Sequence, residues 1–235
     1  MNNTEYPLRE RARQNQPSWA EDIMQPWDDH GFSEKEGFIT SHYWTGQGSV
    51  NVFNVVGTIH PDYQRKSWMN LLENGKRMNQ NLPLLESNPS YYHDTVIKQP
   101  NMYFKTVDGT NFFIGDDGNH RTCIARFYFY EQGMTQLHGV NINHYQIDEV
   151  FYSVYQNLLA EIERLKLRVY LKPRKTLMRR DDTAGWKTDY FQTELIWREN
   201  DCELLLSRSD AEQKLLALKD KGNGIFSLLK KLSFR

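Results

Sequence analysis

Cysteine is scarce in this sequence, and long apolar runs are missing. The chain of 235 residues contains two cysteines, Cys123 and Cys202, which lie far apart and lack metal-binding spacing. Such usage favours a reducing cytoplasm over a disulfide framework. No apolar run reaches the roughly 18–20 residues that cross a bilayer, and the N-terminal residues contain no apolar segment typical of a signal peptide. The sequence therefore predicts a cytoplasmic protein that makes no contact with a membrane.

Motifs of several common sites are missing as well. None of the 7 histidines pairs with another at metal-ligand spacing with cysteine or carboxylate support, which argues against a structural zinc. The sequence has no G-x-x-x-x-G-K-[ST] and no G-x-S-x-G, which are the patterns of the P-loop and of the α/β-hydrolase nucleophile.

The composition does allow a folded core, and the charge is unevenly spread. Hydrophobic residues make up 39% of the chain and aromatic residues 13%, so the chain falls outside the class expected to be disordered. The net charge is −1, yet residues 161–235 hold 17 Lys/Arg and 12 Asp/Glu, whereas residues 1–160 hold 12 and 18. Such asymmetry between halves suggests a polyanion-binding face.

Eight basic residues lie between positions 164 and 180 with no acidic residue among them. They are Arg164, Lys166, Arg168, Lys172, Arg174, Lys175, Arg179 and Arg180. A nucleic-acid backbone is the partner that this run predicts, with binding that weakens as salt rises. An ordinary solvated surface is the alternative, because charge runs are common on protein surfaces.

Two stretches predict β-hairpins. Residues 102–115 contain two β-prone runs on either side of Asp108-Gly109, a dipeptide favoured in type I′ turns. A second pair of runs, DYFQTELIW and CELLLS, lies between residues 189 and 207 and predicts another hairpin.

Helical patterns occur between these strands. Apolar residues at helical spacing follow Asn119, and Gly133 stands where that helix would end. Asp148 is the predicted N-cap of an amphipathic helix, and Ser209 with Glu212 has the pattern of a capping box. Together these elements predict an α+β fold, a mixed sheet with packed helices, and a C-terminal helix–hairpin–helix extension.

The stretch FFIGDDGNHRTCIARF, from Phe112 to Phe127, predicts a strand, a glycine turn and the start of a helix. Gly115 and Gly118 can adopt positive φ, which lets a backbone bend sharply and approach a ligand closely. The first amides of the helix, from Asn119 onward, have no intrahelical partner. Together with the helix dipole they favour binding of a phosphate.

The side chains around this turn suit the same ligand. Arg121 can donate two N–H groups to phosphate oxygens, His120 can donate a hydrogen bond or carry a proton near neutral pH, and Thr122 adds a hydroxyl. Asp116 and Asp117 would repel a bare phosphate, so they predict a Mg²⁺ site or a carboxylate that orients a nucleophile. The alternative is ordinary turn chemistry, in which His120 and Arg121 cap the helix or pair with these aspartates.

Residues 118–121, Gly-Asn-His-Arg, resemble the phosphate-binding signature of the ParB/sulfiredoxin superfamily, and Ala125 falls where the ParB form has a small residue. Residues 59–66, IHPDYQRK, are similar to the Pro-x-Gln-x-Arg stretch that opens ParB-type domains. From about residue 50 to residue 148, the predicted strands, helices and motifs follow one another in the same order as in this superfamily. The resemblance implies a site for ATP or another NTP. Its phosphate-binding residues would be Gly118, Asn119, His120, Arg121, Thr122, Gln64 and Arg65.

The sequence also departs from this superfamily. Sulfiredoxins have a cysteine where this chain has Asn119, and Cys123 lies a helical turn further on, so sulfinic acid reduction is not expected. Segregating ParB proteins continue into a helix-turn-helix region that the C-terminal residues here do not resemble. The chain is more similar to stand-alone members, which include plasmid fertility-inhibition proteins and small kinases that phosphorylate free serine.

Three parts follow from this interpretation. Residues 1–45 are predicted to form a polar and irregular arm, residues 46–148 the ParB/sulfiredoxin-like core, and residues 149–235 a basic extension packed on the core. Within the core, residues 81–101 are predicted to be a connection broken by prolines.

Three functions fit these parts. The first is an NTP-dependent phosphohydrolase or nuclease that acts on DNA, with Asp117, His120 and Arg121 as catalytic residues and Asp116 and Asp117 as metal ligands. The second is a non-catalytic nucleotide- or DNA-binding regulatory module that holds a protein partner through the C-terminal extension. The third is a small-molecule kinase, which would leave the basic run unexplained.

Overall fold

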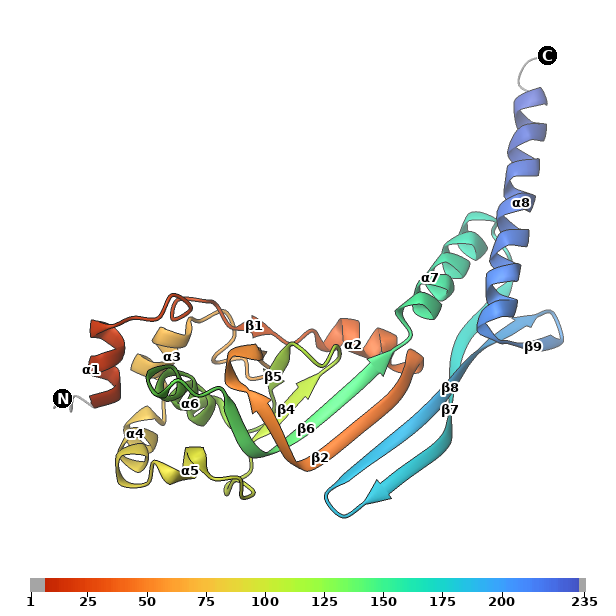
Figure 1. Cartoon of the computed structure of the whole chain (residues 1–235). Helices are drawn as coiled ribbons and strands as arrows, with labels where there is room; N and C mark the ends of the chain where they lie inside the picture. Colours follow the sequence, from red (N-terminus) through yellow and green to blue (C-terminus); the bar gives the residue numbers. More distant parts are fainter. Residues whose placement is uncertain (1–6, 233–235) are drawn as a thin grey trace. The chain divides into compact units, whose positions relative to one another are not determined.

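The computed structural model describes residues 7–232, with side chains described as far as residue 220, and the chain folds into two compact units. Among the described residues, unit 1 contains 7–29, 42–145 and 181–188, and unit 2 contains the remainder. Four strands contribute residues to both units (Figure 1). They are β2 (Ile39–Asn51), β6 (Gln136–Ile147), β7 (Val169–Thr183) and β8 (Trp186–Glu199).

Unit 1 is built on a mixed sheet. Its strand order is β1 (Gln25–Pro26), β3 (Val55–Thr58), β5 (Phe112–Ile114), β4 (Tyr103–Thr106), β6 and β2. The pairs β1–β3, β3–β5 and β4–β6 are parallel, and β4–β5 is antiparallel. The observed architecture is therefore α+β with a mixed sheet, as the sequence predicts.

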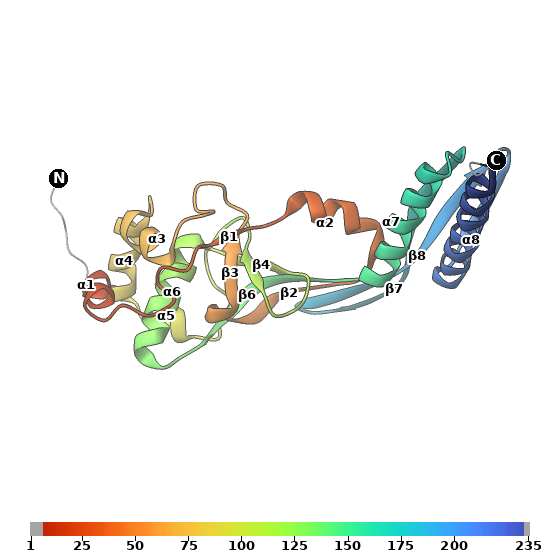
Figure 2. The same cartoon turned by 90° about the horizontal axis from the view of Figure 1, so that it is seen from above.

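The helices of unit 1 gather around one central helix. They are α1 (Pro7–Gln14), α3 (Trp68–Asn74), α4 (Met78–Ser87), α5 (Ser90–His93) and α6 (Asn119–Gln132). Helix α6 packs against α1, α3 and α4 (Figure 2). It begins at Asn119 and is followed by Gly133 in the left-handed conformation, as predicted. Helix α4 occupies much of the expected proline-broken connection, with Pro83 inside it.

The expected irregular arm at residues 1–45 contains regular structure instead. Its described part includes α1, β1, α2 (Asp29–Lys35) and the start of β2. Leu8 and Ala12 are buried in the core of unit 1, and the ring centroid of Trp19 lies 4.8 Å from that of Phe127. The polar composition misled the prediction because a few apolar side chains on one face suffice to hold a short helix against a core.

The predicted hairpin of residues 102–115 is present as β4 and β5, but its turn differs from the predicted type. Gly109 has a φ of 74°, whereas Asp108 does not have positive φ, and a type I′ turn needs both. The Asp108 carboxylate instead accepts hydrogen bonds from the backbone N–H groups of Thr110 and Asn111, at 2.8 and 2.7 Å. An aspartate side chain that accepts from backbone N–H groups further along the chain forms an Asx-turn, and here it takes the place of the predicted two-residue turn.

Unit 2 has a separate hydrophobic core. Its further elements are α2, the 3₁₀ turn η1 (Glu36–Phe38), α7 (Glu149–Arg164), β9 (Cys202–Leu206) and α8 (Arg208–Leu232). Helices α7 and α8 pack together, and β8 pairs antiparallel with β9, so the second predicted hairpin is confirmed. Phe38, Leu158 and Trp197 lie in this core. Within residues 7–232 no helix combines the length and the apolar character that spanning a bilayer requires.

The caps of the two helices in unit 2 differ in how well the sequence predicts them. Asp148 is the N-cap of α7 and accepts a hydrogen bond from the Phe151 N–H at 2.9 Å, as predicted. Helix α8 is capped two residues earlier than expected, because the Asp210 carboxylate accepts from the Ser207 N–H at 3.0 Å. The pattern Ser-x-x-Asp satisfies the capping box as well as Ser-x-x-Glu, and the two overlap here.

Candidate functional site

The turn from β5 to α6 has the predicted order of strand, glycine turn and helix. Gly118 has a φ of 122°, a conformation that residues with a Cβ rarely adopt, and it is followed directly by Asn119 as the first residue of α6. The Thr122 N–H donates to the Gly118 carbonyl at 2.7 Å. The amides of Asn119, His120 and Arg121 precede that first helical bond and have no acceptor among the described residues.

Two cavities open beside this helix start. The polar cavity, of about 440 Å³, is lined by His60, Asp62, Tyr63, Lys76, Arg77, Asp116, Asp117, Asn119 and His120. The amide cavity, of about 380 Å³, is lined by Gln80, Asn81, Leu84, Asn88, Tyr91, Tyr92, Gln99, Pro100 and Arg121, together with Arg77, Asp117 and His120. The cavities share the last three residues, so they adjoin along one wall.

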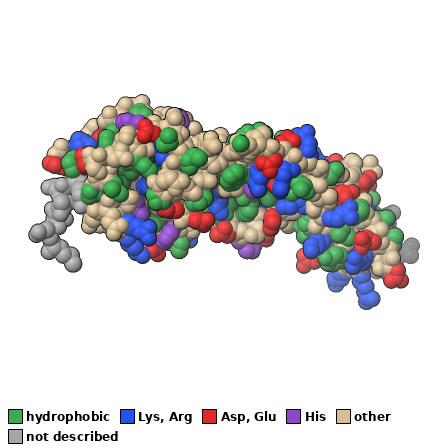
Figure 3. Space-filling view, turned by 90° about the horizontal axis from the view of Figure 1, so that it is seen from below, with side chains coloured by type: hydrophobic (Ala, Val, Ile, Leu, Met, Phe, Trp, Pro, Cys, Tyr) green, Lys and Arg blue, Asp and Glu red, His purple; other side chains and the backbone are tan. Residues whose placement is uncertain are grey.

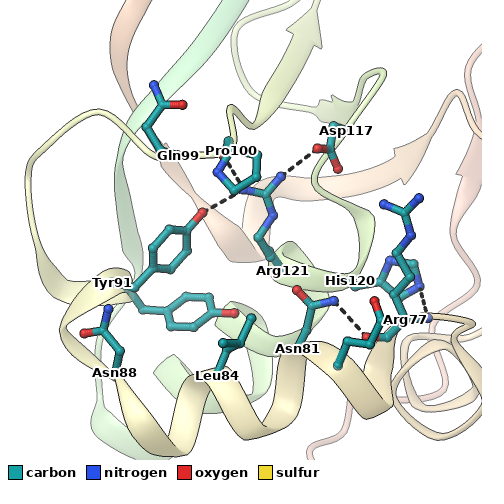
Figure 4. Close-up of a pocket in the computed structure, with 12 residues that line it drawn as sticks. Arg77, Asn81, Leu84, Asn88, Tyr91, Gln99, Pro100, Asp117, His120 and Arg121 are labelled. Atoms are coloured by element: carbon teal, nitrogen blue, oxygen red, sulfur yellow. Dashed lines mark hydrogen bonds and ion pairs between the residues drawn. The ribbon is translucent and has the colours of Figure 1, made fainter.

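Arg121 points away from the polar cavity and is only 9% exposed. Its Nη1 donates to the Tyr91 hydroxyl at 2.8 Å and to the Pro100 carbonyl. Its Nη2 donates to the Asn101 carbonyl at 2.8 Å and pairs with Asp117 Oδ2 at 2.9 Å (Figure 4). Each terminal nitrogen therefore uses both of its protons on protein groups. The guanidinium fastens the loop at residues 100–101 to α6 and offers no free fork to a phosphate.

His120 is a neutral hydrogen-bonding group rather than a proton carrier near neutral pH. Its Nε2 accepts from the Arg77 backbone N–H at 3.2 Å and lies 3.1 Å from the Tyr63 hydroxyl. Burial, followed by the charge of Arg77, lowers the pKa of His120 from 6.5 to about 4. Since Nε2 accepts, the proton of the neutral ring is on Nδ1.

The side chains of Asn119 and Gln64, two other predicted phosphate ligands, bond to other protein groups. Asn119 Oδ1 accepts from the Thr58 hydroxyl at 2.7 Å. Thr122 is fully buried and lines neither cavity. Gln64 Nε2 donates to the carbonyls of Thr58 and Ile59, each at 3.2 Å. These contacts fix the loop after β3 against the start of α6.

Arg65 is exposed, adopts a φ of 61° and lines neither cavity. Its backbone N–H donates to the Met24 carbonyl at 2.9 Å. The Arg65 side chain therefore contributes to neither cavity, and its grouping with Gly118–Thr122 stays a prediction of the resemblance.

Two cations that sequence analysis missed line the polar cavity. Lys76 pairs with Asp62 at 2.5 Å. Arg77 is exposed, and among the described residues its guanidinium has no hydrogen bond or ion pair. Arg77 precedes α4 and lies 43 positions before His120 in the chain, so no local motif could have joined them.

The two aspartates expected to hold Mg²⁺ differ in availability. Asp117 Oδ1 accepts from the Gly118 N–H at 2.7 Å, and Oδ2 pairs with Arg121. Asp116 is exposed and lines the polar cavity. No three His, Cys, Asp or Glu side chains cluster as a metal site in the part of the chain that the structure describes. Mg²⁺ commonly uses one or two carboxylates together with ligand phosphates, so Asp116 fits as such a ligand.

The basic run lies partly in α7, partly in the loop that follows and partly in β7. Arg164 is in α7, Lys166 and Arg168 are in the loop, and the other five are in β7. Successive side chains of a strand point to opposite faces. Lys172, Arg174 and Arg180 therefore lie on one face of β7, and Lys175 and Arg179 on the other.

Acidic and aromatic neighbours engage much of this run. Arg164 pairs with Glu161, Arg174 with Glu194, and Arg180 with Asp189, each at 2.5 Å. Lys175 lies 3.8 Å from Glu36, and Arg179 lies over the Tyr190 ring. Lys and Arg atoms mix with Asp and Glu atoms on the face shown in Figure 3. The run therefore forms no single cationic face, and DNA binding stays a prediction.

No protein-family model matches the chain, and no match is found among curated proteins or among solved structures. The resemblance to the ParB/sulfiredoxin superfamily therefore stays a prediction, and the geometry of the two cavities carries the functional proposal.

Proposed function

We propose that the polar cavity binds the phosphate group of a small phosphorylated ligand, of which a nucleotide is the type that the sequence resemblance favours. One observation carries this proposal. Asn119 and His120, whose amides have no acceptor among the described residues, line the same cavity as the uncompensated guanidinium of Arg77. Free amides at a helix start and an arginine are the two groups that most often hold phosphate oxygens in proteins.

Two carboxylates of the cavity, Asp62 and Asp117, are already paired within the protein. Lys76 neutralises Asp62, and Arg121 neutralises Asp117. Asp116 is the exposed carboxylate that faces the ligand, and a Mg²⁺ shared with the phosphates would offset its repulsion. His120 adds a neutral N–H donor on Nδ1, since burial keeps its pKa low.

The geometry favours binding over hydrolysis. All three residues that the sequence assigns to catalysis are engaged: both oxygens of Asp117, both terminal nitrogens of Arg121, and the accepting nitrogen of His120. A general base needs a free acceptor within reach of the proton that it removes. A non-catalytic module that binds a phosphorylated ligand is therefore the function that the site supports best. DNA cleavage and serine phosphorylation stay predictions from the sequence.

Calorimetric titration of Arg77→Ala with ATP and with tripolyphosphate, each with and without Mg²⁺, tests this proposal. We expect the affinity for both ligands to fall about 10-fold or more, since a charge-assisted contact contributes roughly 1.5–3 kcal/mol. Arg13→Ala is the matched control, because Arg13 is an exposed arginine of the same unit that lines neither cavity. Its affinities should equal those of the wild type.

Two outcomes would overturn the proposal. One is the absence of binding by the wild-type protein at millimolar ligand. The other is an Arg77→Ala variant with unchanged affinity while Arg65→Ala loses binding, which would favour the assignment made from the sequence pattern.

A further inference from the structure

The amide cavity differs in chemistry from the polar cavity beside it. Helix α4, helix α5, residues 99–100 and the start of α6 form its walls (Figure 4). Beyond the wall that it shares with the polar cavity, its lining holds four carboxamide side chains, two tyrosines and a leucine, but no lysine, aspartate or glutamate.

The carboxamides leave both donors and acceptors for a ligand. Asn81 Nδ2 donates to the Arg77 carbonyl at 2.8 Å, so its Oδ1 remains an acceptor. Asn88 Oδ1 accepts from the Ser90 hydroxyl at 2.6 Å, so its Nδ2 remains a donor. Gln80 and Gln99 are exposed and have no protein partner among the described residues, so each offers both groups.

Tyr91 provides a fixed aromatic ring in this lining. Its hydroxyl accepts from Arg121 at 2.8 Å, and its ring packs edge-on against Tyr92 with centroids 5.1 Å apart. Lys98 Nζ lies 5.3 Å from the centroid of the Tyr91 ring. A ring held at its hydroxyl and by its neighbours is a surface on which a planar group can pack.

The charge of Arg121, which lines this cavity, is not available to a ligand. Asp117 neutralises it, and the other three protons of its terminal nitrogens are donated to the Tyr91 hydroxyl and to the Pro100 and Asn101 carbonyls. An anionic group would find no free cation here apart from Arg77 at the shared wall. A purely aliphatic group would leave the carboxamides without the hydrogen bonds that they make to water.

We infer that the amide cavity receives a neutral, planar ring that carries both hydrogen-bond donors and acceptors, which is the chemistry of a nucleobase. This inference rests on the proposed function, since the phosphates of the same ligand would occupy the polar cavity. The shared wall of Arg77, Asp117 and His120 places the two cavities side by side, so one ligand can extend from one to the other. The ligand class is therefore a nucleotide rather than inorganic polyphosphate or a phosphorylated aliphatic compound.

Titration with tripolyphosphate and with the four common nucleoside triphosphates tests the inference. We expect at least one nucleotide to bind about 10-fold more tightly than tripolyphosphate, because the ring adds contacts that tripolyphosphate lacks. The double variant Gln80→Ala/Gln99→Ala should lose most of this preference and keep the affinity for tripolyphosphate. Both side chains are exposed and have no protein partner among the described residues, so the variant is expected to fold.

Gln132→Ala is the control, because Gln132 is an exposed carboxamide at the end of α6 that lines neither cavity. The inference is wrong if no nucleotide binds more tightly than tripolyphosphate, or if the double variant weakens both ligand types equally. In either case binding of tripolyphosphate would leave the proposed function intact. If neither tripolyphosphate nor any nucleotide binds, the proposed function fails too.

Discussion

Helix α6 in unit 1 and the part of strand β7 that lies in unit 2 both carry arginines, and the two elements use them in opposite ways. Arg121 and Arg126 of α6 are buried and donate to main-chain carbonyls. Arg174 and Arg180 of β7 are half-exposed and pair with carboxylates of the neighbouring strand β8. In both elements, the number of basic residues therefore does not predict how many of them are free to bind an anionic ligand.

The difference shows why local sequence misplaces anion sites. A guanidinium can be satisfied by carbonyls, by aromatic rings or by carboxylates, and all three occur in this chain. Arg77, which has no basic pattern around it beyond Lys76, is the cation that remains available beside the start of α6. Removing an arginine of α6 should therefore cost more stability than removing one of β7.

Arg126 is expected to give the largest effect. Its Nη1 donates to the Val52 and Val55 carbonyls at 3.1 and 2.7 Å, and its guanidinium lies 4.6 Å from the Trp19 ring and 4.5 Å from that of Trp68. Burial lowers its pKa to about 10. Arg126→Met should reduce the free energy of unfolding by about 3 kcal/mol, since two buried carbonyls lose their donor. Urea unfolding measures this loss.

Arg126→Lys is the comparison for that variant. Lysine keeps the charge but lacks the planar fork, so we expect an intermediate loss. A Met variant as stable as the wild type would mean that the desolvation of the guanidinium cancels its contacts, as in some buried ion pairs.

Arg121 comes next. Arg121→Met removes the contacts to Tyr91, Pro100, Asn101 and Asp117, and we expect a loss of about 2 kcal/mol in urea unfolding. Unchanged stability together with lost tripolyphosphate binding would contradict this, because it would show that the guanidinium turns to the ligand as the sequence predicts.

The third effect concerns pH and His120. Its folded-state pKa, about 4, is below the ordinary 6.5, so between these values the unfolded chain binds a proton that the folded chain does not. The free energy of unfolding should therefore fall as pH drops from 6.5 to 4, by about 1 kcal/mol after allowance for partial exposure. Urea unfolding at pH 7 and pH 4.5 measures it. His120→Gln should lack this component; an identical pH dependence in the variant would refute the assignment.

The smallest effect is expected in β7. Arg174 and Glu194 are 45% and 25% exposed, and exposed ion pairs contribute about 0–1 kcal/mol. Arg174→Ala should therefore change the free energy of unfolding by less than about 1 kcal/mol, as should Glu194→Ala. If either variant lost about 2 kcal/mol or more of its free energy of unfolding, the arginines of β7 would contribute to stability as much as those of α6, and the contrast would be wrong.

Sequence patterns predicted the local elements well where one physical signal dominated. The start of α6 after Gly118, its end at Gly133 and the cap at Asp148 all match, because capping and positive φ depend on neighbouring residues. The type I′ turn failed because the Asp108 side chain competes with the turn for backbone N–H groups. Whether the side chain or the turn obtains these N–H groups depends on the conformation of the whole loop, which the dipeptide Asp-Gly does not determine.

The candidate site was less predictable than the fold. The backbone donors of residues 119–121 follow from the helix start alone, and two of these residues, Asn119 and His120, line the polar cavity. The orientation of Arg121 depends on a loop 20 residues before it, and Arg77 joins the site through the packing of α4 on α6. A local sequence pattern cannot predict contacts between residues that lie so far apart in the chain.

The sequence by itself determined that a glycine turn would open a helix at Asn119, because only nearby atoms decide backbone conformation and free amides there. Tertiary structure decided which cation lies beside those amides and which cations are already neutralised. The physical reason is that a long charged side chain takes whichever partners folding brings within hydrogen-bonding distance, and those partners come from distant parts of the chain.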